Sequence, residues 1–158
     1  MPILNSDKKK EMESLNALFE FATEGIIITD KKGVITKANP SSERLFGYNK
    51  GELIGKTVEN LIPDHLTHKH QGHREKFNKN PHSRSMGQDM ALMAKRKDGT
   101  EFPVEISLTH FVQDKEMHVV AFIIDISERL AAQEKIKRVN IELEQKVSER
   151  TKVLQEAL

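Results

Sequence analysis

The first hydrophobic pattern along the chain is helical. Between residues 7 and 22, apolar residues recur at spacings of three and four, with lysines and glutamates in between: Met12, Leu15, Leu18, Phe19 and Ala22. This spacing places the apolar side chains on one face of an α-helix. We therefore expect an N-terminal amphipathic helix within residues 1–22.

The pattern then changes to that of a β-hairpin. Residues 26–28 are a run of isoleucines that favours a strand, and residues 34–38 form a second short segment of this kind. Residues 30–33 between them have the composition of a turn, with glycine where a positive φ is tolerated. Asn39-Pro40 then predicts a helix start, because Asn caps helices well and Pro is accepted at the first helical position.

The following segments predict one helix and three strands. Residues 64–77 are the longest interior helical candidate. Alternate apolar positions next predict a strand, made by Met86, Met90, Leu92 and Ala94. Asp98-Gly99 is typical of a hairpin turn; a cleanly alternating strand follows over residues 102–109, and residues 117–126 supply the last strand. Two strands, short helices and three strands indicate an α+β fold with an antiparallel sheet.

The last 32 residues predict a long exposed helix. From residue 127 onward there is no glycine or proline, and charges of both signs are interspersed. Arg150 would occupy a d position, so the seam is imperfect. We expect a coiled-coil signalling helix over residues 127–158 that forms a parallel homodimer, with a single helix folded back on the sheet as the alternative. The expected contact residues at a and d are Ile136, Asn140, Leu143, Val147 and Leu154.

Composition narrows the possible functions. Lys and Arg number 25 against 24 Asp and Glu, a net charge of +1, which gives no electrostatic case for a nucleic-acid partner. The absence of cysteine excludes disulfides, thiolate metal sites and cysteine nucleophiles. The longest apolar run, residues 119–124, is too short to span a bilayer, and the N-terminus lacks the apolar core of a signal peptide. We expect a soluble, cytoplasmic fragment without membrane contact.

Three segments resemble the PAS sensory family, in the family's order. The first is EGIIITDKKGVITKANPSSERLFGYNKGELIGKTVENLIP, which resembles the N-terminal half. The others are KRKDGTEFPVEISLT, similar to the central hairpin, and FIIDISERLAAQEKI, similar to the closing strand and exit helix. The resemblance implies a five-stranded antiparallel sheet over residues 23–126, with short helices on one face enclosing a cavity for a small-molecule ligand.

The C-terminal segment carries a second resemblance. It reads NIELEQKVSERTKVLQEAL and is similar to linkers that precede the dimerisation and phosphoacceptor domain of sensor histidine kinases. This implies the sensor of a two-component kinase, which detects a small ligand, a gas or a redox state and relays it through a dimeric coiled coil. A ligand-free PAS dimerisation and relay module, or the sensor of a diguanylate cyclase, are the alternatives. We find no catalytic motif, and expect no enzyme activity of the chain itself.

The resemblance also places Asp125 and Ser127 where the last strand meets the exit helix. Asp125 can bond to backbone or side chain at this point, which would make Asp125 and Ser127 residues of signal relay. In the alternative interpretation the two residues only cap the helix, with Ser127 as the N-cap.

The histidines are the unusual chemistry of the sequence. Four of the seven lie in the expected helix over residues 64–77, and two i,i+3 pairs could in principle hold zinc: His65 with His68, and His70 with His73. Neither pair encloses a carboxylate, so a solvated helix face is the default. His110 is expected near a strand end as a hydrogen-bonded rim residue.

His70 differs because of its neighbours. The segment HQGHREKF places His70, His73 and Phe77 where heme-binding oxygen-sensing PAS domains have H-x-x-Y-x-x-x-Y. The resemblance implies heme b with His70 as the iron ligand and Met90 at the position of the distal Arg, although both tyrosines are replaced. A polar helix-face histidine without a cofactor is the alternative, and flavin is a weaker candidate.

Three further basic residues could attract an anion. They are Arg84, Arg96 and Lys97. We expect all three on exposed loops, where scattered basic residues need no ligand to explain them.

Overall fold

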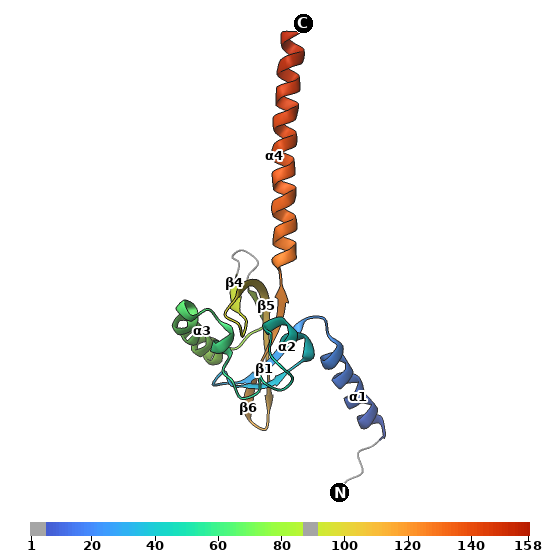
Figure 1. Ribbon diagram of the computed structural model, residues 1–158. Coiled ribbons are helices and arrows are strands. Elements are labelled where there is room, and N and C mark those ends of the chain that lie inside the picture. The colour runs from blue at the N-terminus through green and yellow to red at the C-terminus, as the bar shows by residue number, and fades with distance from the viewer. Residues whose placement is uncertain (1–5, 87–91) are drawn as a thin grey trace. The chain divides into compact units, whose positions relative to one another are not determined.

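A computed structural model of the chain describes residues 6–86 and 92–158 (Figure 1). The chain divides into two compact units, residues 1–125 and 126–158. The first unit contains α1 (Ser6–Phe21), β1 (Gly25–Asp30), β2 (Ile35–Ala38), α2 (Pro40–Phe46), the 3₁₀ turns η1 (Val58–Leu61) and η2 (Asp64–Leu66), α3 (Thr67–Lys79), β3 (Arg84–Met86), β4 (Leu92–Lys95), β5 (Glu101–Gln113) and β6 (Glu116–Asp125). The second unit contains α4 (Ser127–Glu156).

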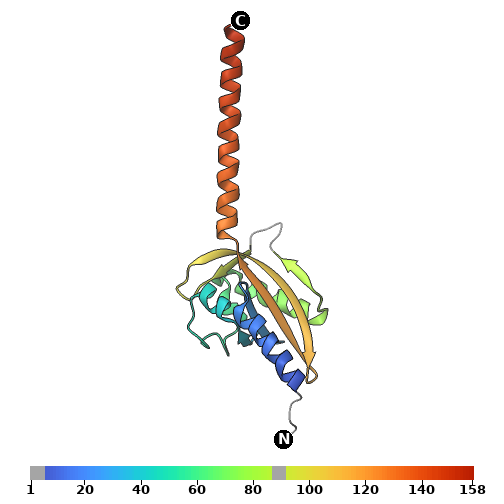
Figure 2. The ribbon, with the colours of Figure 1, turned by 90° about the vertical axis from the view of Figure 1, so that its right-hand side faces the viewer.

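The strands form one antiparallel sheet in the order β2-β1-β6-β5, with β3 and β4 both paired to β5. Figure 2 shows the long β5–β6 pair from the side. The expected α+β architecture is therefore confirmed. The single strand predicted from Met86 to Ala94 is wrong, because Met86 lies opposite Ile106 and Leu92 opposite Val104, so the register shifts between two short strands.

The core lies on the inner face of the sheet, where alternate strand residues meet the short helices. Ile27, Val104 and Ile123 are buried there, as the alternation of each strand requires. Phe46 of α2 packs edge-on against Phe102 of β5, with ring centroids 5.6 Å apart. The predicted covering of one sheet face by short helices is thus present (Figure 1).

Asn39 confirms its predicted role as a helix cap and has a larger one. Its Oδ1 accepts hydrogen bonds from the backbone N–H groups of Ser42 (3.0 Å) and Ile26 (2.8 Å). Its Nδ2 donates to the carbonyl oxygens of Phe19 (3.1 Å) and Glu24 (3.0 Å). One completely buried side chain therefore joins α1, β1 and α2.

One predicted helix start and one predicted helix cap are wrong. Residues 64–66 form the 3₁₀ turn η2 after Pro63, so α3 begins at Thr67 rather than at Asp64. In α4 the N-cap position belongs to Ile126, and Ser127 is the first helical residue rather than the cap. Helix ends often carry 3₁₀ turns that apolar spacing does not distinguish from α-helix.

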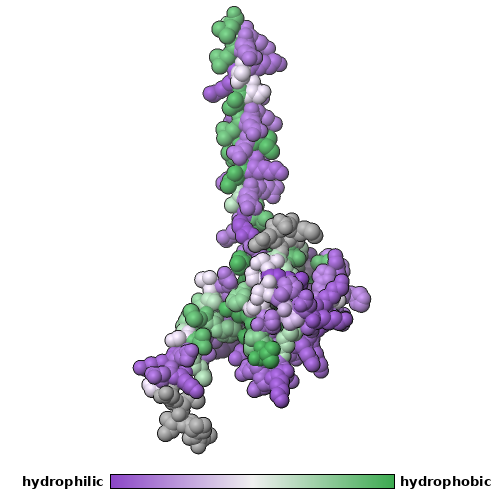
Figure 3. All heavy atoms as spheres, turned by 180° about the vertical axis from the view of Figure 1, so that it is seen from behind, coloured by the Kyte–Doolittle hydropathy of each residue, from purple (hydrophilic) through white to green (hydrophobic). Residues whose placement is uncertain are grey.

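Helix α4 is continuous over 30 residues, and none of them is buried. Hydrophobic side chains recur along its whole length among hydrophilic ones (Figure 3). Val147 is 64% exposed and Leu154 68%. Within the described residues, no helix is long and apolar enough to cross a bilayer.

Candidate functional site

Polar contacts attach α3 to the rest of the domain. Arg74 Nε donates to Oε1 of Glu59 at 2.8 Å, and the Glu59 side chain on η1 is only 7% exposed. The Arg74 side chain passes so close to Gly33 that a Cβ there would lie 2.8 Å from its Nε, and the φ of Gly33 is +82°. Asn78 Nδ2 also donates to the Lys31 carbonyl oxygen at 2.6 Å. Since Phe77 is the one buried residue of this helix, these bonds hold α3 in place.

His70 lies beside the same carboxylate. Its Nδ1 is 3.5 Å from Oε1 of Glu59, which is longer than a good hydrogen bond. That nitrogen is buried, and it has no hydrogen-bond partner among the described residues. Burial lowers the pKa of His70 below its usual value, and the Glu59 carboxylate offsets only part of this effect. With Nδ1 turned toward Glu59, Nε2 is the nitrogen that remains for a ligand.

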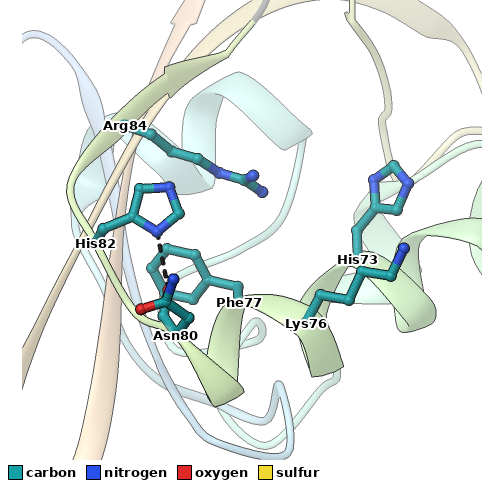
Figure 4. A pocket seen from close by; sticks show the side chains of 6 residues that line it. All are labelled: His73, Lys76, Phe77, Asn80, His82 and Arg84. Atoms are coloured by element: carbon teal, nitrogen blue, oxygen red, sulfur yellow. Dashed lines mark hydrogen bonds between the residues drawn. The ribbon is translucent and has the colours of Figure 1, made fainter.

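A pocket of about 300 Å³ lies at the C-terminal end of α3 (Figure 4). Its lining comes from α3, from the segment that follows it, and from β3: His73, Lys76, Phe77, Asn80, His82 and Arg84. The helix breaks at Asn80-Pro81, and β3 starts only a few residues later. This brings basic residues from both sides of the break to one opening. Arg84 is therefore a strand residue of a pocket, and the expectation of an exposed loop position is wrong.

Four buried polar atoms have no hydrogen-bond partner among the described residues, and they gather around this helix. They are His70 Nδ1, Asn78 Oδ1, Arg84 Nε and His110 Nδ1. The His110 ring reaches α3 from β5, with its centroid 6.5 Å from that of Phe77. His110 was expected to be hydrogen-bonded, but its Nδ1 has no hydrogen-bond partner among the described residues. Buried polar atoms are seldom left unpaired, so this concentration marks the α3 side as unusual.

A second, polar pocket of about 360 Å³ lies at the end of β6. It is lined by Thr23, Ser41, Arg44, Leu45, Arg96 and Asp125. Arg96 Nη2 lies 3.2 Å from Oδ2 of Asp125, and its guanidinium is 3.9 Å from the Phe102 ring centroid. Asp125 therefore bonds to a side chain at the end of the last strand, as one of the two interpretations expected. Arg96 lies in a loop as expected, but it is half-buried and paired with Asp125, so the expectation of an exposed position is wrong.

The two histidine pairs considered for zinc differ in their placement, since only His70 and His73 lie in one helix. His65 lies in η2 and His68 in α3, so the two do not share a regular helix face. In residues 6–86 and 92–158, no group of three or more His, Asp or Glu side chains is placed to hold a metal ion. Met90, the second residue of the heme hypothesis, lies outside the described residues, and neither pocket is lined by His70.

The sequence matches the PAS domain family over residues 23–128, and the chain therefore belongs to that family. A solved PAS domain, from the HTR-like protein of Haloarcula marismortui, superposes with a TM-score of 0.63 at 24% identity. It covers 75% of this chain and 99% of that domain. Matches at this identity establish the fold.

Curated relatives are larger signalling proteins. Sensor protein FixL of Bradyrhizobium diazoefficiens is 25% identical over 148 residues, which cover 89% of this chain and 29% of FixL. Oxygen sensor protein DosP of Escherichia coli is 24% identical, with 74% of this chain and 15% of DosP covered. Cell-division control histidine kinase PdhS of Brucella ovis is 32% identical, over 39% of this chain and 6% of PdhS. The chain spans less than a third of each relative, and it is a PAS sensory domain related to sensor kinases.

Proposed function

We propose that this chain is the sensory module of a sensor histidine kinase. The alignment with the sensor protein FixL carries the proposal, because it covers 89% of the chain whereas the PAS family match ends at residue 128. The similarity therefore extends beyond the PAS domain itself. The module detects a small ligand, gas or redox state, and passes the change to an output domain. The cytoplasmic location expected from the sequence stays a prediction.

Asp125 is the proposed point of departure of the signal. It closes β6, it pairs with Arg96, and it is followed directly in the chain by the first residues of the second unit. A shift of the sheet that strains the Arg96–Asp125 pair is passed on through Ile126 and Ser127. Replacement of Arg96 by Gln removes the pair and should uncouple ligand binding from the output of a kinase that carries this module.

Two copies of α4 are proposed to form a parallel coiled coil. Val147 and Leu154 supply a-position contacts, and Asn140 favours one register at some cost in stability. Val147→Asp with Leu154→Asp should convert the dimer to a monomer in light scattering. The control is Gln145→Asp with Lys152→Asp, which places two aspartates at outward-facing f positions of the same helix, outside the a and d seam. A dimer that survives the first double variant places the interface elsewhere.

The chain itself is proposed to lack kinase activity, since its sequence carries neither a phosphoacceptor segment nor nucleotide-binding boxes. It should neither bind ATP nor incorporate labelled phosphate. Incorporation into the purified chain would overturn its assignment as a sensory fragment.

Heme b at His70 is the second candidate. It is favoured by the similarity to the oxygen sensor DosP and by the Glu59 carboxylate beside Nδ1, since histidine ligands commonly turn their other nitrogen toward a carboxylate. His70 would be the proximal ligand and Met90 a distal neighbour. The bound group would supply gas binding or redox chemistry. Added hemin should give a sharp Soret band that His70→Ala abolishes and His73→Ala retains. Equal loss in both variants, or no band in the unmodified protein, contradicts this candidate.

A further inference from the structure

The charged residues that line the pocket at the end of α3 are all cationic. Of its lining residues, Lys76 and Arg84 are cationic, His73 and His82 can become so, and the described lining contains no carboxylate. Four other cations of the domain are paired with a carboxylate: Arg74, Lys95, Arg96 and Lys97. Within the described residues, Lys76 and Arg84 take part in no ion pair. This electrostatic environment favours an anion.

The pocket is also lined by two aromatic rings, those of Phe77 and His82. Phe77 is buried, and the guanidinium of Arg84 lies 5.6 Å from its ring centroid. The imidazole of His82 packs against the same ring with centroids 5.9 Å apart. Phe77 and His82 therefore give the pocket an aromatic wall, which an apolar ring can contact and a simple inorganic ion cannot use.

Arg84 is positioned to bind an oxyanion. Its Nε is buried and has no hydrogen-bond partner in the described part of the chain, so this donor has no acceptor among those residues. Figure 4 shows this guanidinium projecting between His82 and His73. A guanidinium presents a fork of donors that matches a carboxylate, and such charge-assisted bonds are about twice as strong as neutral ones.

His82 adds a second fixed group. Its Nδ1 lies 2.8 Å from the Asn80 carbonyl oxygen, which can only accept, so Nδ1 carries the proton in that bond. Nε2 is then the nitrogen left for a ligand. The Asn80 bond holds the ring over Phe77, where it completes a preformed site.

We propose that this pocket binds a small aromatic carboxylate, with its ring against the aromatic wall of Phe77 and His82 and its carboxylate between Arg84 and Lys76. A volume of about 300 Å³ suits a molecule of one ring. The inference rests on the proposed sensory function and names the class of ligand that such a sensor would detect. It does not use the proposed iron ligand of the heme candidate, because His70 does not line the pocket.

Isothermal titration of the full chain with benzoate tests the proposal, with benzamide and inorganic phosphate as comparison ligands. Benzoate should bind saturably and more tightly than either. Arg84→Gln should weaken benzoate binding at least about tenfold, the equivalent of one charge-assisted hydrogen bond. The matched control is Lys79→Gln, which removes a cation from the same helix outside the pocket and should leave the affinity unchanged.

Several results would overturn the proposal. They are no saturable benzoate binding, equal affinity for benzamide, tighter binding of phosphate, and equal weakening by Lys79→Gln. None of these bears on the proposed dimeric relay, which light scattering of the α4 variants tests separately. Conversely, if the unmodified chain is monomeric but binds benzoate through Arg84, the proposed pocket stands and the proposed dimeric relay is contradicted.

Discussion

The two ends of the inner sheet face are held by different forces. At the α2 end, Asn39 makes four hydrogen bonds with backbone groups of three elements, and Phe46 and Phe102 pack edge to edge in the core. At the α3 end, one side chain of the helix, Phe77, is buried, and the attachment depends on the Arg74–Glu59 pair. The four unpaired buried polar atoms of the described residues all lie at this second end.

The contrast indicates where a ligand can change the domain. At the α2 end, the buried polar side-chain atoms of the described residues have partners inside the protein, so a small molecule gains fewer new bonds with buried groups there. At the α3 end, unpaired donors and cations can gain new bonds, and a helix with few apolar contacts can shift at low cost. We infer that α2 and Asn39 form the scaffold and that α3 is the responsive element.

Loss of the Asn39 side chain should have the largest effect. Asn39→Ala removes four hydrogen bonds and leaves buried backbone groups unpaired, which should lower the free energy of unfolding by about 3 kcal/mol. Urea denaturation measures the change. The control is Asn60→Ala at an exposed amide, which should cost within about 0.5 kcal/mol. Similar losses of unfolding free energy in the two variants would show that the Asn39 side chain is not essential to the scaffold.

Removal of the clamp on α3 should have a smaller effect. Arg74→Met leaves the carboxylate of Glu59 nearly buried and unpaired, at a cost of about 2 kcal/mol in urea denaturation. The matched control is Lys95→Met, which breaks an ion pair to Asp64, a residue that is 91% exposed. That change should cost at most about 1 kcal/mol. Equal costs would mean that the Arg74–Glu59 pair does not hold the helix.

The pH dependence at His70 should be the smallest of the three effects. Burial lowers the pKa of His70 in the folded state, so the folded protein resists taking up this proton. The stability that depends on neutral His70 is therefore full above about pH 6.5, the usual unfolded value, and is lost as the pH falls through that value toward the lower folded pKa. His70→Gln should flatten this loss, whereas His68→Gln, at an exposed position, should not. The free energy of unfolding is measured between pH 7.5 and 5. An equal fall in the unmodified protein and in both variants would contradict the prediction.

Local patterns in the sequence were sufficient for the scaffold. The isoleucine run of β1, the alternation of β5 and the Asn39-Pro40 helix start each depend on neighbouring residues, and the structure confirms all three. The additional bonds of Asn39 to Phe19 and Glu24 could not be predicted, because they join segments that only the fold brings together.

The α3 side was predicted less well for the same reason. The pocket combines Lys76 from a helix with His82 and Arg84 from beyond its break, and no spacing rule connects these residues. The expected helix ended at residue 77, close to the observed end of α3 at Lys79, but the direction in which the chain continues depends on the pairing of β3 with β5. His70 was singled out by resemblance, whereas its nearness to Glu59 follows from how α3 packs on η1.

Native-state hydrogen exchange of the free chain at pH 7 tests the contrast between the two ends most directly. The account predicts that amides of α3 exchange through local openings, at free energies well below that of global unfolding, while amides of β1 and α2 approach the global value. Protection of α3 equal to that of β1, or openings that begin at α2, would contradict the assignment of α3 as the responsive element.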